Sequence, residues 1–306
     1  MTLAPIFTPR RMLRSDLTLI ITGAVAFIAL CLLFSPFVAD DAFIVGRYAN
    51  NAVHGQGLVY NPGEYVSALT SPLHALVETV LALCGLPPVG SYRILAPLLV
   101  LAGWFIAIRE HGLSHAELML FTAAALFSPF LALWTVGGLE TPILASLATL
   151  FTSRLVVISQ RGSAKGYDFP WLGALAGLMF LTRYDSALVT VPPLIAILTI
   201  ERRRPALWAG ATLGILLAAS WLVFAELYYG DVFPTSYYVK FVLGTRPRID
   251  SLSTTLNFPL LSGLILPLLI RPRVKVANQP ALSKAILLGA AVSLSLFLFY
   301  ALRTSG

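Results

Sequence analysis

The chain has 306 residues, of which 58% are hydrophobic and 11% charged, and its mean hydropathy is +0.83. Soluble globular domains are roughly 25% charged, so this composition excludes a typical soluble domain and predicts a polytopic membrane protein. The formal net charge of +7 is also found in nucleic-acid-binding proteins, but most Lys and Arg residues here lie in short segments between apolar runs. Membrane topology explains such a distribution, and we expect no nucleic-acid partner.

The apolar runs are long and do not alternate with polar residues, which favours helices over a β-barrel. The first run, 17–38, follows Arg10, Arg11 and Arg14. It is too long for the apolar region of a typical signal peptide, and no small-residue cleavage site precedes Asp40, so we expect a retained first transmembrane helix. The later runs are 72–86, 94–108, 116–136, 142–158, 170–181, 187–200, 206–229, 256–270 and 285–302.

Loop charge indicates whether the short run 72–86 crosses the bilayer. If the N-terminus is cytoplasmic and 72–86 dips without crossing, 14 Lys and Arg residues lie inside and 7 outside. If 72–86 spans, the numbers become 9 and 12. The positive-inside rule favours the first arrangement. We therefore expect an all-α, polytopic transmembrane helix bundle in the cell membrane. It would have about nine spans plus one re-entrant or juxtamembrane helix, form a single domain over 1–306, and carry no soluble domain.

In this topology the inner loops carry only topogenic charge, and four polar clusters lie on the outer face. They are 40–65, 137–141, 182–185 and 228–248. The first cluster opens with two adjacent acids, Asp40 and Asp41, in the outer loop 38–71. A plain connector would not need thirty residues, so this loop is a candidate functional segment.

Three ionisable residues, Glu140, Arg183 and Asp185, stand at breaks between apolar runs. Ionisable groups at membrane depth are costly and mark candidate sites. Two structural explanations remain open. Arg183 and Asp185 could form a local ion pair that caps a turn, and Glu140 could favour the dipole of the following helix.

Other polar and aromatic residues of the outer clusters are weaker candidates. Arg47, His54 and Glu64 lie in the polar segment behind the acidic pair. Tyr237 belongs to an aromatic cluster that suits either an interfacial belt or a lipid or sugar surface. Lys240 is either a donor to a lipid phosphate or a rim charge.

Histidines and cysteines give no clear signal of a metal site. His74, His111 and His115 lack metal-ligand spacing, and Cys31 and Cys84 lie in apolar runs. We expect ordinary structural roles for all five.

Carboxylates, a few cations and tyrosines beside lipid suit the transfer of a group from a lipid phosphate. One carboxylate can act as general base on an acceptor hydroxyl. Either Lys and Arg or a divalent metal held by acids can stabilise the departing phosphate. If a metal is used, Mg²⁺ or Mn²⁺ on Asp40, Asp41 and Glu140 is the candidate set. No phosphate-binding loop for a nucleotide is present.

The segment DDAFIVGRYANNAVHGQGLVYNPGEYVSALTSPL, residues 40–73, resembles the first-loop signature of GT-C class membrane glycosyltransferases. The resemblance is to the branch that contains the terminal arabinofuranosyltransferases of actinobacterial cell walls. Later stretches are similar to further motifs of that branch, in the same order: GGLET at 137–141, LTRYD at 181–185 and YYGDVFPTSYYVK at 228–240. Tyr184 departs from the pattern, because relatives usually have Pro there.

This resemblance implies a GT-C-like fold, a polyprenyl-phosphate sugar donor, and a glycan or lipid acceptor on the extracytoplasmic side. It implies that Asp40 or Asp41 is the catalytic base or acceptor anchor. Lys240 and Arg183 would face the donor phosphate, and Glu140 would line the same cavity. The complete set of candidate substrate-binding residues is Arg47, His54, Glu64, Glu140, Arg183, Asp185, Tyr237 and Lys240.

The sequence leaves several questions open. The chain stops at FYALRTSG, where longer relatives continue through a further outer motif, so we expect a C-terminal truncation relative to them. A non-catalytic protein that binds or transports lipid phosphate or glycan, and an inactive truncated paralogue, are the alternatives to an enzyme. Arabinofuranose, hexose and aminoarabinose donors all fit the same residues.

Overall fold

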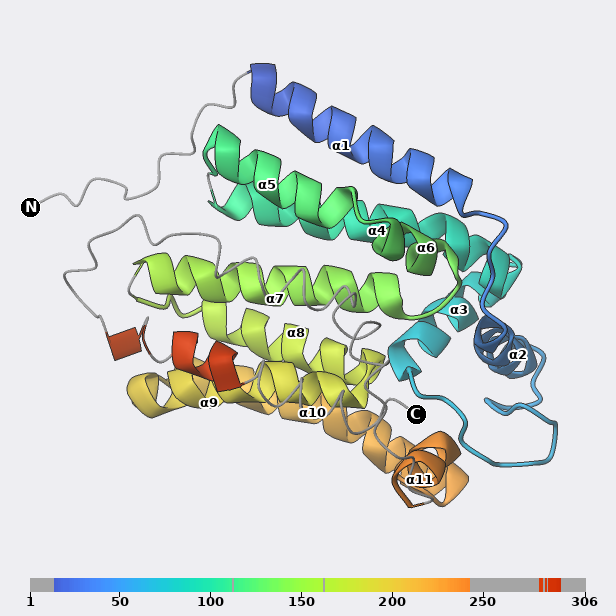
Figure 1. The fold of residues 1–306 in the computed structure, drawn as a ribbon. Helices are drawn as coiled ribbons and strands as arrows, with labels where there is room; N and C mark the ends of the chain where they lie inside the picture. Colours follow the sequence, from blue (N-terminus) through green and yellow to red (C-terminus); the bar gives the residue numbers. More distant parts are fainter. Residues whose placement is uncertain are drawn as a thin grey trace, which may run out of the picture.

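The computed structural model describes residues 14–111, 113–161, 163–242, 281–282, 284 and 286–292, and of residues 160 and 240–242 it describes the backbone alone. Within this part of the chain the secondary structure is entirely helical (Figure 1). The helices are α1 (Arg14–Leu33), α2 (Asp41–Val53), α3 (Pro72–Leu83), α4 (Pro88–His111), α5 (His115–Leu126), α6 (Pro129–Val136), α7 (Thr141–Arg161), α8 (Asp168–Thr182), η1 (Tyr184–Ser186), α9 (Ala187–Glu201), α10 (Pro205–Tyr229) and α11 (Thr235–Val242).

Five described segments are long and apolar enough to cross a bilayer: α1, α4, most of α7, η1 with α9, and α10. The expected run 116–136 forms two helices, α5 and α6, bent by 47°, and counts as a sixth span at most. The bend follows from Ser128 and Pro129, because Ser128 caps a new helix whose first residue is Pro129.

The expected count of about nine spans is therefore not confirmed. The run 72–86 forms α3, a helix of 12 residues, and 170–181 lies in α8, a helix of 15 residues. Both are shorter than the roughly 20 residues that a perpendicular span needs. The run 256–270 and most of 285–302 lie outside the described residues.

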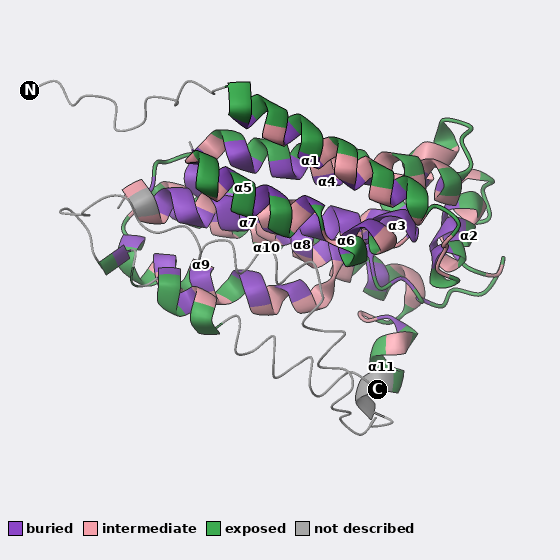
Figure 2. Cartoon of the chain, turned by 45° about the horizontal axis from the view of Figure 1, so that its top comes forward, coloured by how far each residue is buried: buried purple, intermediate pink, exposed green. Residues whose placement is uncertain are grey.

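Many residues on the outward faces of the helices are exposed (Figure 2), and large apolar residues are prominent among them. Val25 of α1 is 62% exposed, and Ile215 and Leu227 of α10 are 66% and 82% exposed. Side chains of this kind would be unfavourable in water along whole helices, whereas hydrocarbon solvates them, and the helical backbone satisfies its own hydrogen bonds. The exposed pattern therefore agrees with a membrane-embedded bundle.

Helices α8 and α10 cross at very close range because glycines line both faces of the crossing. A Cβ on Gly173 would overlap the backbone of Gly210, and a Cβ on Gly210 would overlap the backbone of Phe169. Gly177 and Gly214 extend the contact one turn along each helix. Small residues spaced four apart let transmembrane helices approach closely. The crossing holds the end of α8, which carries Arg183, against α10.

The long helices run side by side, and α2, α3 and α11 gather at one end of the bundle (Figure 1). We call this the α2 end. The turn between α9 and α10 lies at the opposite end. The C-terminal helical residues 286–292 pack on α9, where Gly289 contacts Pro193.

Candidate active site

The acidic pair stands where the chain leaves α1 and begins α2. Asp40 is the N-cap of α2, and its Oδ1 accepts a hydrogen bond of 3.0 Å from the backbone N–H of Asp41. Both aspartates are exposed, and neither forms an ion pair with a described residue. One face of α2 is buried through Ala42, Val45 and Tyr48. The sequence therefore fixes α2 by its apolar face and leaves two carboxylates open at its positive N-terminal end.

Arg93 of α4 fastens the loop before this pair to the end of α6. Its guanidinium donates to the carbonyl oxygens of Ser35 at 2.5 Å, Phe37 at 3.0 Å and Val136 at 2.6 Å. Next to it, the N–H of Ala39 donates to the carbonyl of Gly137 at 2.9 Å. The segment that leads into the first polar cluster and the segment that leads into the GGLET turn are thus held together by carbonyls that converge on one cation and by the Ala39–Gly137 hydrogen bond. Arg93 is one of the seven Lys and Arg residues that the favoured topology places outside, and its sequence position alone did not indicate this role.

The GGLET turn depends on a glycine. Gly138 has φ +84°, and a Cβ there would press on Ala42 of α2. A side chain at this position would be strained in both backbone conformation and space. The turn therefore lies directly against the helix that begins with the acidic pair.

Glu140, Arg183 and Asp185 form one connected group of charges at the same end. Arg183 donates through Nη1 to Glu140 at 2.9 Å and through Nε and Nη2 to both oxygens of Asp185, at 3.0 and 2.8 Å. Desolvation opposes the charge of Arg183, but the carboxylates of Asp185 and Glu140 outweigh it and raise the pKa of Arg183 above its ordinary value. The GGLET and LTRYD segments, 43 residues apart, thus share a bidentate arginine.

The loop that follows α2 is joined to α10 and α11 by hydrogen bonds that involve the backbone of the loop. The N–H of Leu58 donates to the Tyr228 hydroxyl at 3.0 Å, and the Tyr229 hydroxyl donates to the carbonyl of Leu58 at 2.7 Å. The N–H and hydroxyl of Thr235 both donate to the carbonyl of Ser67, at 2.9 Å each. The first and fourth polar clusters are therefore in direct contact. Each of the four clusters now has at least one hydrogen-bonded neighbour among the other three.

Several candidate binding residues form their polar contacts within α2 and the loop that follows it. Arg47 donates to the carbonyl of Tyr60 at 2.8 Å and lies over its ring at 4.6 Å. His54 Nδ1 lies 2.7 Å from the backbone carbonyl oxygen of Asn50, one turn earlier in α2. Glu64 accepts from Asn61 at 2.9 Å. Their predicted contact with substrate stays a prediction.

The aromatic segment at the end of α10 and in α11 forms a stacked group. Tyr237 stacks on Phe233 with ring centroids 4.6 Å apart, and Phe233 also contacts Tyr184. Tyr184 accepts a hydrogen bond from Trp221 of α10 at 2.8 Å. An aromatic wall therefore adjoins the LTRYD turn, and the tyrosine that stands in place of Pro is part of it. Lys240 belongs to α11, but its side chain lies outside the described part of the structure.

A buried pair on α3, His74 and Glu78, was also missed. Both side chains are fully buried, and His74 Nε2 lies 3.3 Å from Glu78 Oε1. Among the described residues the Glu78 carboxylate accepts no hydrogen bond. The His74 ring packs on Tyr92 with centroids 4.2 Å apart, and the Tyr92 hydroxyl donates to the carbonyl of Leu139 at 2.9 Å. The sequence signal for this pair is its four-residue spacing on one helix, which brings the two side chains together.

No group of three or more His, Cys, Asp or Glu side chains in the described part of the chain is arranged to hold a metal ion. The candidate set of Asp40, Asp41 and Glu140 is thus not assembled as a metal site. Glu140 is instead engaged by Arg183. His111 and His115, expected to be structural, contact Ser153 at 2.9 Å and Asp16 at 2.8 Å.

Comparison with known proteins gives one informative similarity. Over 228 aligned residues the chain is 29% identical to the terminal beta-(1->2)-arabinofuranosyltransferase of Mycobacterium tuberculosis (strain ATCC 25618 / H37Rv). The alignment covers 69% of this chain and 36% of that relative, so the chain matches little more than a third of the relative's length. No protein-family model matches, and no solved structure matches. The similarity relates the chain to a glycosyltransferase.

Proposed function

We propose that the protein is a membrane glycosyltransferase that moves a sugar from a polyprenyl-phosphate donor to an extracytoplasmic glycan or lipid acceptor. One observation carries the proposal. Four polar segments, spread over two hundred residues, meet at one end of an apolar bundle. Hydrogen bonds join the first segment to the fourth and the second to the third, and the N–H of Ala39, next to the first segment, donates to Gly137 of the second. The similarity to an arabinofuranosyltransferase supports the reaction class and makes arabinofuranose the first donor to test.

The proposed base is one of the two exposed aspartates. A general base must reach a substrate hydroxyl, and the carboxylates of Asp40 and Asp41 are the only candidate acids of the described site that are exposed and outside an ion pair, apart from Glu64. The Asp40 carboxylate already accepts a hydrogen bond as the helix cap, whereas the Asp41 carboxylate has no hydrogen-bonded partner among the described residues. Both can therefore be tested by the same substitution, because Asn keeps the shape and removes the charge.

The role first expected for Arg183 needs revision in this proposal. Its guanidinium is shared by two carboxylates, so the group as a whole carries one formal negative charge. Such a group is better suited to hold acceptor or sugar hydroxyls than to hold a phosphate. We assign Arg183 the positioning of Glu140, and assign the donor phosphate to Lys240.

The decisive experiment measures sugar transfer from radiolabelled polyprenyl-phosphate arabinofuranose in membranes that contain the full chain. We expect one of Asp40→Asn and Asp41→Asn to lower the rate by about 100-fold or more, the usual contribution of a general base. Glu226→Gln is the matched control, because Glu226 is an exposed acid of α10 at the same end of the bundle. Full activity of both Asn variants, with normal membrane insertion, would reject the assignment of the base.

The same preparation separates an enzyme from a binding protein. Saturable binding of the labelled donor by the purified chain, without transfer to any cell-envelope acceptor, would support a lipid-phosphate carrier instead. Transfer that depends on Asp40 or Asp41 supports the enzyme.

The proposed orientation places the N-terminus in the cytoplasm and the α2 end outside. In a Cys31→Ser, Cys84→Ser background, Glu64→Cys should react with an impermeant maleimide on intact cells. Lys165→Cys, at the opposite end, should react only after lysis. The reverse pattern of labelling would place the site on the cytoplasmic face.

A further inference from the structure

The end of the bundle opposite the candidate active site carries a small cationic pocket. Helix α9 ends at Glu201 and α10 begins at Pro205, and the turn between them is Arg202, Arg203 and Arg204. Helix α10 has 25 residues, so this turn lies about 37 Å along the helix axis from the tyrosines that contact the first loop. Any ligand bound here is separate from the proposed sugar transfer.

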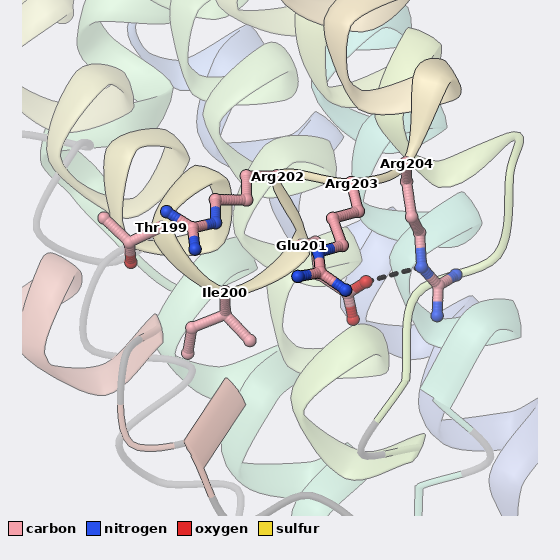
Figure 3. A pocket seen from close by; sticks show the side chains of 6 residues that line it. All are labelled: Thr199, Ile200, Glu201, Arg202, Arg203 and Arg204. Atoms are coloured by element: carbon pink, nitrogen blue, oxygen red, sulfur yellow. Dashed lines mark ion pairs between the residues drawn. The ribbon is translucent and has the colours of Figure 1, made fainter.

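The pocket has a volume of about 390 Å³. Its walls are formed by Thr199, Ile200, Glu201, Arg202, Arg203 and Arg204 (Figure 3). Three guanidinium groups and one carboxylate give it two net positive formal charges. A space of this size and sign suits one phosphate-bearing group with its immediate substituents.

The three arginines are not equivalent. The Nε of Arg204 pairs with the buried Glu201 at 2.5 Å, and its Nη1 donates to the carbonyl of Ala164. Arg204 therefore anchors the turn to the segment that connects α7 and α8. Arg202 and Arg203 are exposed, and their guanidiniums make no hydrogen bond or ion pair with any described residue. These two side chains have their donors available for a ligand.

The residues around the pocket are of the types found at the boundary of a membrane. Trp208 is 52% exposed, and its indole N–H donates to the carbonyl of Arg202 at 2.9 Å. Ile200, in the pocket wall, is 36% exposed and apolar. Exposed Trp next to Arg at the end of an apolar helix is typical of the lipid headgroup level. The pocket thus offers cations at headgroup depth and apolar surface on the side of the bilayer.

We propose that this pocket binds a phosphate-bearing anion through Arg202 and Arg203, and that an anionic phospholipid headgroup supplies it. Topogenic charge alone explains why the loop contains arginines. It does not require a buried Glu201–Arg204 pair that fixes one arginine while two others line a hollow. Free phosphate presents the same chemistry, so the test includes it.

The experiment uses the full chain purified in detergent. Binding of dioctanoyl-phosphatidylglycerol, dioctanoyl-phosphatidylcholine and inorganic phosphate is measured by titration calorimetry. We expect saturable binding of phosphatidylglycerol, at least about tenfold tighter than phosphatidylcholine. The double variant Arg202→Gln, Arg203→Gln removes both charge-assisted donors and should weaken this binding by about tenfold or more.

The matched control is Arg109→Gln. Arg109 is also exposed and lies at the same end, at the last turn of α4, but outside the pocket. It removes the same kind of charge and should change affinity less than twofold. The variant Arg202→Lys, Arg203→Lys keeps the charge and should bind with intermediate affinity, because Lys lacks the planar fork of donors.

The outcomes are distinct. Loss of binding in the Gln variant, with the control unchanged, supports the pocket. Competition by millimolar phosphate would then identify the phosphate group itself as sufficient, and its absence would identify the lipid. An equal loss in Arg109→Gln, or equal binding of both lipids, would show general attraction to a cationic surface and overturn the proposal. Circular dichroism checks that each variant is folded, and sugar transfer should be unaffected in all of them.

Discussion

Two arginines of this bundle are each flanked by two carboxylates, one at each end of α8. At the α2 end, Arg183 joins Glu140 and Asp185. At the opposite end, Arg154 of α7 joins Glu110 at 2.5 Å and Asp168 at 3.3 Å. Arg161 also lies 3.7 Å from Asp168, so the second group contains one more cation, and the two groups differ further in access.

Exposure separates the two groups. The Arg183 side chain is 34% exposed, whereas Arg154 is 13% exposed and Asp168 is fully buried. Asp168 also accepts a hydrogen bond from the backbone N–H of Lys165. A closed group of this kind fixes helices to one another, and a group open to solvent can also meet a ligand. The comparison teaches that an arginine between two acids does not identify a site until its accessibility is known.

The largest expected effect on stability comes from breaking the closed group. Asp168→Ala leaves Arg154 with one partner in a buried site, and loss of one member of a buried ion pair costs about 3–5 kcal/mol. We expect a large fall in the thermal unfolding midpoint, measured in detergent by the fluorescence of the tryptophans. A midpoint within two degrees of the wild-type value would contradict a structural role for this group.

A smaller loss of stability should follow when α8, the helix that joins the two charged groups, is displaced. Gly210→Ala places a Cβ into the backbone of Phe169 on α8, and overpacking of this kind costs about 1–3 kcal/mol. Both groups should then be perturbed together, so stability and transfer should fall in the same variant. Gly166→Ala is the control, since its nearest neighbour would be the Cβ of Ala206 at 4.0 Å.

Breaking the open group should affect activity more than stability. Arg183→Ala removes three charge-assisted hydrogen bonds from Glu140 and Asp185, and we expect transfer to fall about 10- to 100-fold. The stability change should stay below that of Asp168→Ala, because exposed ion pairs are screened by water. Arg183→Lys should rescue part of the activity. Equal destabilisation by Arg183→Ala and Asp168→Ala would remove the distinction between the two groups.

The same residue gives an expectation for pH. The folded pKa of Arg183 is raised above its ordinary value, so the stability that Arg183 contributes is fully present below that ordinary value and is lost only above it. The stability difference between wild type and Arg183→Ala should therefore be constant from pH 7 to 10. Chemical denaturation at several pH values measures it, and a difference that shrinks toward pH 10 would be inconsistent with this pairing.

The smallest effect is expected at the buried pair on α3. Glu78 accepts no hydrogen bond from a described residue, so Glu78→Gln removes a costly buried charge and keeps the shape. We expect a stability change within about 1 kcal/mol. Asp168→Asn should cost more, because Asp168 accepts hydrogen bonds from Arg154 and from the Lys165 N–H. Strong destabilisation by Glu78→Gln would show that Glu78 depends on an ionic contact with His74.

Much of the site's location was predictable from sequence. Charged residues such as Asp40, Glu140 and Arg183 interrupt apolar runs, and the cost of burying charge makes such breaks informative. Their contacts were not predictable. The convergence of Ser35, Phe37 and Val136 on Arg93 involves carbonyl groups, which every residue carries and which leave no trace in side-chain patterns.

The helical breaks were harder to predict than the helices. The run 116–136 has the length of one span, and only the bend at Pro129 shows two helices. The runs 72–86 and 170–181 form short helices whose depth in the bilayer depends on neighbours such as α10. Hydropathy measures length and polarity, and neither determines how far a short helix is held inside a bundle.

The sequence by itself determined that the chain enters the membrane as helices, because lipid leaves the backbone no other way to satisfy its hydrogen bonds. It also determined which polar segments interrupt those helices. The tertiary structure decided which of them meet. Close approach at Gly173 and Gly210 and the three carbonyls around Arg93 bring distant segments together. It also decided that the Arg183 side chain is partly exposed and that of Arg154 largely buried, because burial is a property of the packed bundle rather than of residue type.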